Sequence, residues 1–167
     1  MRYLDVMNET KPVGIPTSEE ARADVIVRGN AKGFVQDIEA GRFHIQADEP
    51  TSIGGTDAAP TPYDYLLGAL GACTSMTIGL YARKKGWPLE EVKVGLHHSR
   101  IHAKDCEDCE TKNGMLDHID IKVDLSGPLT DEQRAKLMEI AGKCPVHRTL
   151  KSEIKVRVRP ETTGTPA

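Results

Sequence analysis

Three stretches in which apolar and polar residues alternate predict antiparallel β-strands, each with one face toward water. These stretches cover residues 92–96, 119–125 and 154–158. Two shorter β-rich runs, 34–39 and 42–47, flank Ala40-Gly41 and predict a hairpin with its turn at that pair. A further β-rich run covers 23–28.

Apolar residues at helical spacing predict a long helix from Pro62 to about Lys85. Thr61 and Asp64 have the spacing of a capping box at its start, and Gly86 is a suitable residue to end it. At ~1.5 Å per residue the helix would be about 36 Å long. Its internal glycines predict a close approach of another element and are Gly68, Gly71 and Gly79.

A second helix is predicted from the capping box formed by Thr130 and Gln133 to about Lys143. Pro145 disfavours helical geometry at the preceding residue, so the helix has to end before Cys144. The same proline suits the first position of a new short helix, which Cys144 would cap.

The order of elements is strands, long helix, strands, helix and strand, which predicts an α+β fold. The length of 167 residues suits one domain, and a composition of 28% charged and 38% hydrophobic residues is polar for a globular protein but not that of a disordered chain. We assign that domain to residues 23–160, with a flexible arm at 1–22 and a frayed tail at 161–167. The formal net charge of −3 argues against a general nucleic-acid binder.

The chain is expected to be soluble and cytoplasmic. Its N-terminus has no apolar signal region, and its longest apolar stretch, 65–73, is shorter than the ~20 residues that span a bilayer. The sequence has four cysteines, and in this compartment cysteines are more often reactive or metal-binding than structural disulfides.

Cys73 is predicted to face an apolar interior. The apolar residues that share its helical face are Leu66, Ala69, Leu70, Met76, Thr77 and Leu80. One interpretation is an inert, buried cysteine that packs as a small hydrophobe. The other is a nucleophile, which would need a basic side chain from elsewhere, because apolar surroundings disfavour the thiolate and Cys73 lies beyond the first turn.

Cys144 has a different local environment. As a helix cap it would lie beside backbone N–H groups, and His147 and Arg148 follow within one turn. Local electrostatics therefore favour Cys144 as the better thiolate of the two. The alternative is that the Cys-Pro pair only separates two helices.

The segment 62–77 around Cys73 and the run 144–147 that begins with Cys144 resemble the OsmC/Ohr family, the osmotically inducible and organic-hydroperoxide-resistance proteins. The element order is similar too, over roughly residues 23–160. The resemblance implies an α+β fold with antiparallel sheets packed around the long central helix and an intertwined homodimer with thiol sites at the subunit interface.

For function, the resemblance implies a thiol-dependent peroxidase that reduces organic hydroperoxides in oxidative stress defence. Cys73 would attack the peroxide and Cys144 would resolve the product as a disulfide, which an external thiol reductant reopens. This order reverses the ranking from local electrostatics. No metal or organic cofactor is implied.

Two positions depart from the peroxidase pattern, which pairs the attacking cysteine with an arginine from an early strand-loop and a glutamate directly after the helix-start proline. Here Tyr63 follows that proline, and the carboxylate comes one position later, at Asp64, where it can act as the capping residue alone. The early loop offers Arg28 and Lys32 but no arginine at the expected place. Arg28, Lys32 or Arg148 would then stabilise the thiolate and the leaving alkoxide, and the chain is closer to the OsmC-like branch.

An acidic segment with Cys106 and Cys109 at Cys-x-x-Cys spacing falls outside this scheme. With His102, and with His98 on the same strand face, these thiols would suit tetrahedral zinc. The other interpretation is a solvated acidic hairpin loop. A thioredoxin-like pair is disfavoured because the neighbouring carboxylates disfavour thiolates.

The altered surroundings of Cys73 leave a second function class open, a non-enzymatic dimeric protein that binds an apolar ligand or senses redox state. The zinc-binding Cys-x-x-Cys loop would fit such a protein as well. Rapid oxidation of Cys73 by low peroxide would indicate the enzyme, and slow oxidation with retention of a lipid-like molecule would indicate the binding protein.

Overall fold

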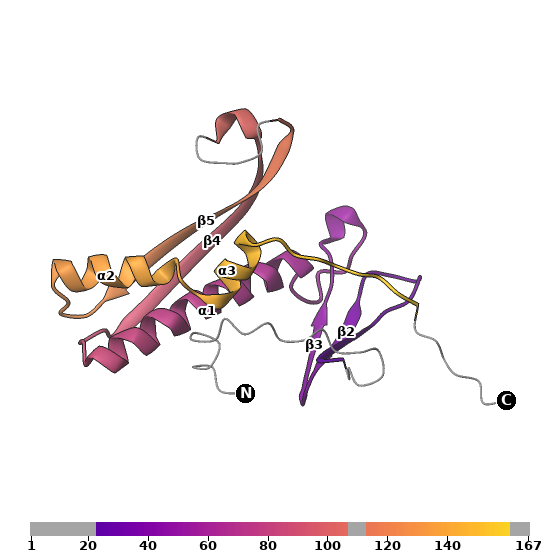
Figure 1. Cartoon of the computed structure of the whole chain (residues 1–167). Helices are drawn as coiled ribbons and strands as arrows, with labels where there is room; N and C mark the ends of the chain where they lie inside the picture. Colours follow the sequence, from indigo (N-terminus) through magenta and orange to yellow (C-terminus); the bar gives the residue numbers. More distant parts are fainter. Residues whose placement is uncertain (1–22, 107–112, 161–167) are drawn as a thin grey trace.

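The computed structural model describes residues 23–106 and 113–160 and has the predicted α+β composition with antiparallel strands (Figure 1). Its strands are β1 (Val25–Arg28), β2 (Gln36–Ala40), β3 (Phe43–Ala47), β4 (Glu91–His102) and β5 (Met115–Ser126). Its α-helices are α1 (Pro62–Lys85), α2 (Asp131–Ala141) and α3 (Pro145–Lys151). Short 3-10 turns at Thr51–Ile53 and Ala103–Asp105 complete the described elements.

The first three strands form an antiparallel sheet in the order β1-β2-β3. Ala40 pairs with Phe43, so the hairpin loop is Gly41-Arg42, one position later than predicted. Gly41 has φ +60, a conformation that glycine adopts at little cost. The sheet lies beyond the N-terminal end of α1 (Figure 1), and its exposed apolar side chains are Val25, Ile26, Val27, Phe43 and Ile45.

The predicted start and end of α1 are confirmed. Asp64 N–H donates to Thr61 Oγ1 at 3.2 Å, and Thr61 N–H donates to Asp64 Oδ2 at 2.9 Å, which completes the capping box. At the other end Gly86 has φ +64, and its N–H donates to the carbonyl of Ala82. Within the described residues, α1 is also the one helix long and apolar enough to cross a bilayer, a test that core helices pass as well.

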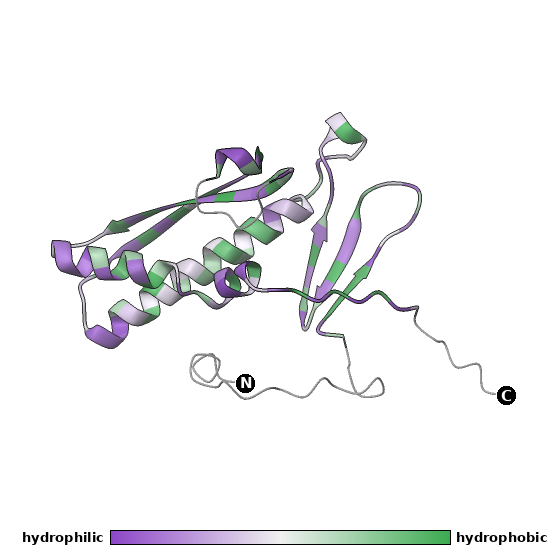
Figure 2. Cartoon of the chain, turned by 45° about the horizontal axis from the view of Figure 1, so that its top comes forward, coloured by the Kyte–Doolittle hydropathy of each residue, from purple (hydrophilic) through white to green (hydrophobic). Residues whose placement is uncertain are grey.

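The strands β4 and β5 form a long antiparallel hairpin that packs along α1. A Cβ at Gly71 would lie 2.7 Å from Leu96 Cδ1, so the absence of a side chain lets β4 approach the helix closely. Gly68 and Gly79 have open space around them, and the predicted close approach therefore holds at Gly71 alone. Figure 2 shows the alternation of hydrophobic and hydrophilic residues along the hairpin.

The larger core cluster lies between α1, the base of the β4–β5 hairpin and α2. Ile78 from α1 and Leu137 from α2 are fully buried in it. The remaining buried members are Ala82, Leu125, Leu129 and Ala141. This packing fixes α2, and with it the turn that leads to Cys144.

Two further sequence predictions are wrong for the single chain. Met76 is 62% exposed and Leu66 is also exposed, so the buried face of α1 is rotated from the predicted one. The residues that it does bury are Leu70, Gly71, Cys73, Thr74, Thr77, Ile78 and Ala82. The predicted strand 154–158 is an extended segment with no strand assigned, and Val158 is 95% exposed. A strand requires hydrogen bonds from a neighbour, and no described strand pairs with this segment.

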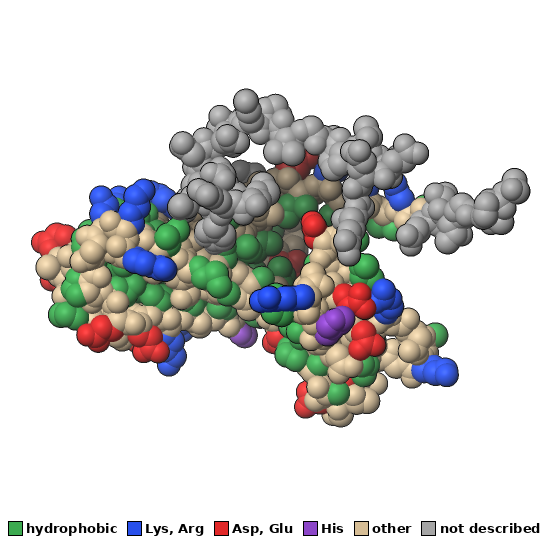
Figure 3. Space-filling model, turned by 90° about the horizontal axis from the view of Figure 1, so that it is seen from below, with side chains coloured by type: hydrophobic (Ala, Val, Ile, Leu, Met, Phe, Trp, Pro, Cys, Tyr) green, Lys and Arg blue, Asp and Glu red, His purple; other side chains and the backbone are tan. Residues whose placement is uncertain are grey.

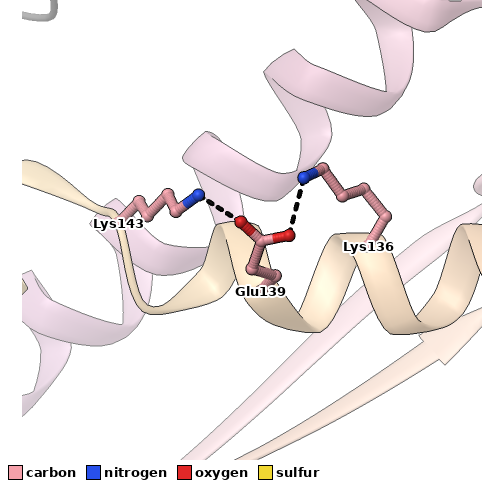
Figure 4. A network of polar contacts seen from close by, with 3 residues as sticks. All are labelled: Lys136, Glu139 and Lys143. Carbon is pink, nitrogen blue, oxygen red and sulfur yellow. Dashed lines mark hydrogen bonds and ion pairs between the residues drawn. The ribbon is translucent and has the colours of Figure 1, made fainter.

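A lysine pair brackets one carboxylate at the end of α2 (Figure 4). Glu139 accepts from Lys136 Nζ at 2.6 Å and also from Lys143 Nζ. The hydrogen bond from Lys136, followed by that from Lys143, lowers the pKa of Glu139 to about 2. Because all three side chains are exposed, the network contributes little to stability and is screened by salt.

A buried carboxylate holds the loop between β3 and α1. Asp48 is 1% exposed, and its Oδ2 accepts from Thr56 Oγ1 at 2.6 Å, Thr56 N at 2.9 Å and Ala58 N at 3.1 Å. These bonds, that from the Thr56 side chain first, lower the pKa of Asp48 from its ordinary value of 3.8 to about 2. The carboxylate therefore stabilises the folded chain above pH 3.8.

The first prediction concerns acid stability. A lowered pKa means that the stabilisation is present above the unfolded value and is lost as pH falls from 3.8 toward about 2. We expect the urea midpoint of unfolding to fall across this pH window. Asp48→Asn should lower the midpoint at pH 7 and weaken its dependence on pH below 3.8, the acid limb of the profile. Glu139→Gln is the matched control, because Glu139 has the same pKa of about 2 but is exposed. An unchanged acid limb in Asp48→Asn would contradict this assignment.

Candidate thiol site

The structure brings Cys73 and Cys144 into one buried cluster. Cys73 lies on α1 and is 7% exposed, whereas Cys144 precedes α3 and is fully buried. Both are reduced thiols. Leu70 is the third buried member, and the hydrophobic side chains packed around the cluster are Leu96, Ile119, Ile121 and Val146. The two sulfurs are thus enclosed by α1, α3 and the β4–β5 hairpin.

Cys144 caps α3, as the sequence predicts. Its backbone is extended because Pro145 follows, and its Sγ accepts a hydrogen bond from the N–H of His147 at 3.2 Å. A backbone donor aimed at a sulfur stabilises negative charge that develops on it. Cys144 is therefore placed to accept charge when a bond to its sulfur breaks.

Thr74, the neighbour of Cys73 on α1, connects the two helices. Its Oγ1 lies 2.8 Å from the carbonyl oxygen of Leu70 and 3.5 Å from Cys144 Sγ. A hydroxyl has one proton, which serves the shorter contact, so its lone pairs are available to the S–H of Cys144. When the sulfur is anionic, the hydroxyl can rotate and donate to it instead. No signal in the sequence singles out Thr74, because its role exists only once α3 packs against α1.

A groove of about 610 Å³ lies against the thiol cluster. Three of its lining residues, Leu70, Ile119 and Ile121, also pack the cluster. Other parts of its wall come from His147 in α3 and from Cys106 after the 3-10 turn that follows β4. The wall of the groove is therefore apolar where it shares residues with the thiol cluster and polar or charged elsewhere.

Of the predicted supporting residues, Arg148 lies on α3 close to Cys144, whose carbonyl accepts from its backbone N–H at 3.0 Å. Asp64 accepts from the Thr61 hydroxyl at 2.7 Å, and bonds from the Thr61 side chain and backbone lower the pKa of Asp64. Arg28 forms an ion pair with Glu39 at 2.5 Å within the three-stranded sheet. Lys32 and Arg148 are exposed. The roles of Asp64, Arg28, Lys32 and Arg148 toward Cys73 stay predictions.

The predicted metal ligands divide between described and undescribed residues. His102 ends β4, Cys106 is in a disulfide, and Cys109 lies outside the described residues. Across 23–106 and 113–160, no three His, Cys, Asp or Glu side chains are grouped as metal ligands would be. A disulfide sulfur is not a thiolate ligand, so zinc binding stays a prediction for the reduced chain.

Tyr63 stands where the peroxidase pattern has a glutamate, and the structure shows what it contacts. Its ring stacks on that of His98 in β4, with centroids 4.6 Å apart and an interplanar angle of 21°. His98 Nε2 lies 3.1 Å from Asp117 Oδ1 in β5. This cluster attaches the first turn of α1 to the hairpin, a contact that sequence reasoning missed.

The fold and the site together define an α+β protein with two reduced cysteines in a buried cluster, one on a central helix and one at a helix cap. Comparison with known families matches residues 55–159 to the OsmC-like proteins, and this chain belongs to that family. No curated protein sequence matches the chain significantly.

Solved structures confirm the fold at low sequence identity. An OsmC-like protein from Mycoplasma pneumoniae is 20% identical with TM-score 0.59, covering 78% of this chain and 88% of its own. An organic hydroperoxide resistance protein from Elizabethkingia anophelis is 16% identical with TM-score 0.58, with coverage of 83% and 94%. A protein of the same description from Legionella pneumophila is 17% identical with TM-score 0.56, with coverage of 76% and 87%.

Proposed function

We propose that this chain is a thiol-dependent peroxidase that reduces organic hydroperoxides. The observation that carries the proposal is the burial of Cys73 and Cys144 in one cluster, which shares Leu70, Ile119 and Ile121 with a neighbouring groove. Two of the similar structures named above are of organic hydroperoxide resistance proteins, which supports a role in peroxide stress.

The exposed fractions of the two cysteine residues favour Cys73 as the attacking residue. Cys73 retains 7% exposure, whereas Cys144 has none, so a peroxide reaches Cys73 first. The Cys73 thiolate attacks the distal peroxide oxygen, the O–O bond breaks, and the alkoxide leaves as the alcohol after it takes a proton. Cys73 is then a sulfenic acid.

Cys144 resolves this intermediate. Its sulfur attacks the sulfenic sulfur, an S–S bond forms, and the hydroxyl leaves as water with the thiol proton. Before the S–S bond forms, the Thr74 hydroxyl oxygen is placed to accept a hydrogen bond from the S–H of Cys144. An external thiol reductant then reopens the disulfide by thiol exchange, and the chain returns to its starting state.

The groove favours an organic hydroperoxide over hydrogen peroxide. Its apolar lining residues Leu70, Ile119 and Ile121 allow the carbon chain of an organic hydroperoxide to be buried away from water, whereas hydrogen peroxide has no apolar part to bury.

Exposed apolar surface supports a homodimer as the working form. Side chains on the three-stranded sheet, Met76 on α1 and Val156 and Val158 near the C-terminus are all exposed in the single chain. Seen from below, hydrophobic side chains gather around the hollow between the helices and the sheet (Figure 3). A second copy would cover this surface and bring Arg28 or Lys32 to the thiols of its neighbour.

The second prediction concerns this assembly. Because residues 154–158 alternate like a strand but have no neighbour, we expect them to pair with the second copy. Light scattering should give a mass about twice 18.3 kDa for the full chain. Truncation after Ser152 should give the single-chain mass, and truncation after Pro160 is the matched control. A full chain that stays single at tens of micromolar would contradict the dimer.

The third prediction tests the reaction itself. One equivalent of cumene hydroperoxide added to the reduced protein should give a Cys73–Cys144 disulfide, identified by peptide mass spectrometry. Cys73→Ser should abolish this crosslink, and Cys144→Ser should leave Cys73 as a sulfenic acid that dimedone traps. If Cys73 stays reduced while the protein retains an apolar molecule, the binding alternative replaces the enzyme.

A further inference from the structure

His147 belongs both to the surroundings of the thiols and to the wall of the groove. Its backbone N–H donates to Cys144 Sγ at 3.2 Å, which holds the first turn of α3 against the buried sulfur. The same residue is half-buried and lines the groove of about 610 Å³. Leu70, Ile119 and Ile121, which also line that groove, pack against the two thiols. An imidazole is therefore present where the proposed substrate would bind.

The proposed reaction needs a proton donor at this place. When the O–O bond breaks, the oxygen attached to carbon leaves as an alkoxide, a strong base that apolar surroundings stabilise poorly. The arginine and glutamate of the peroxidase pattern are replaced or engaged elsewhere here. Arg28 is paired with Glu39 in the three-stranded sheet, and Tyr63 stacks on His98.

The other ionisable side chains that line the groove are less suited to that role. Asp117 Oδ1 lies 3.1 Å from His98 Nε2, and an ionised carboxylate has no proton to give. Lys151 is exposed one helical turn beyond His147, and His118 is exposed on β5. A histidine side chain exchanges a proton readily near neutral pH. The hydrogen bond to Cys144 together with this chemistry favours His147.

We propose that the His147 imidazole is a further catalytic residue, the general acid that protonates the leaving oxygen, an inference that rests on the proposed peroxidase reaction. The Cys73 thiolate attacks the distal peroxide oxygen, so an S–O bond forms and the O–O electron pair moves to the oxygen attached to carbon. The imidazolium of His147 gives its proton to that oxygen, and the alcohol leaves. The neutral imidazole regains from solvent a proton equal to the one that Cys73 released when it ionised.

The backbone and the side chain of His147 thus serve different steps. The N–H group stabilises charge on Cys144, the resolving sulfur, whereas the imidazole acts in the first oxidation of Cys73. His147→Gln keeps the backbone N–H and removes the acid. The variant therefore isolates the contribution of the side chain.

Two oxidants of similar size test the assignment. Cumene hydroperoxide releases an alkoxide, which needs a proton, whereas peroxybenzoic acid releases a carboxylate, which does not. Reduced protein freed of reductant is mixed with each oxidant and stopped with acid at intervals, and the remaining Cys73 thiol is alkylated and measured by peptide mass spectrometry. His147→Gln should slow the reaction with cumene hydroperoxide at least about a hundredfold and leave that with peroxybenzoic acid at the wild-type rate.

His97→Gln is the matched control, because it makes the same change at an exposed histidine of β4 that does not line the groove. It should react with both oxidants as wild type does. Unchanged rates of His147→Gln with both oxidants would overturn the general acid and leave the peroxidase proposal standing. Equal slowing with both would also overturn it, since the side chain would then act on Cys73 or on the fold. Failure of wild type to oxidise Cys73 with either oxidant would overturn both proposals.

Discussion

Cys73→Ser is expected to abolish catalytic consumption of organic hydroperoxide. Removing a nucleophile lowers turnover by on the order of 10⁴-fold or more, because no other group supplies the covalent step. Cys144→Ser should differ in kind, since Cys73 is still oxidised once per chain and only the resolving step is lost. The measurement is peroxide loss by the ferrous–xylenol orange assay with dithiothreitol as reductant.

Met138→Ala is the control for this pair, because it truncates an exposed side chain on α2 that contributes to neither the thiol cluster nor the groove. It should retain the first oxidation of Cys73 at the wild-type rate. Circular dichroism should show that all three variants remain folded. Full turnover by Cys73→Ser would remove Cys73 from the mechanism and, with it, the proposed order of attack and resolution.

The sequence predicts best those parts of the fold that local chemistry decides. Thr61, Asp64 and Gly86 satisfy the free backbone groups at the ends of α1 with contacts three or four residues away, so a single stretch of sequence contains the whole cause. The same holds for Cys144, whose capping geometry follows from Pro145 beside it.

Predictions that depend on distant partners do less well. Residues 154–158 alternate as a strand does, but a strand exists only with a neighbour, and the described chain provides none. The buried face of α1 is rotated toward Thr74 and Ile78 because that is where β4, α2 and α3 pack, and an apolar residue such as Met76 is left outside. Composition alone does not show which apolar face a chain uses for itself.

The site shows the same division. Spacing and context point to Cys73 and Cys144, whereas Thr74 enters through a contact across 70 positions of sequence. Local electrostatics favour Cys144 as the attacking thiolate, and the hydrogen bond from His147 agrees with that reasoning. Burial favours Cys73 as the attacking residue instead, because Cys144, which has the better electrostatics, is not exposed to a substrate. A resolving role reconciles the two observations.

The largest stability effect is expected at α2. Leu137 is fully buried in the cluster that also holds Ile78, and Leu137→Ala would leave a cavity that the helices cannot fill without moving. We expect a loss of about 2–5 kcal/mol in the free energy of unfolding, measured by urea denaturation. Met138→Ala on the same helix is the matched control, because Met138 is 46% exposed. It should change stability by no more than about 0.5 kcal/mol.

Leu137→Ala also separates the scaffold from the chemistry. The α2 helix ends at Ala141, three residues before Cys144. The packing of α2 in the core therefore determines the position of the resolving sulfur. If α2 positions Cys144, the variant should form the Cys73–Cys144 disulfide more slowly under folding conditions, while the first oxidation of Cys73 keeps its rate. Equal slowing of both steps would mean that the cavity loosens α1 as well, and that Cys73 and Cys144 share one support.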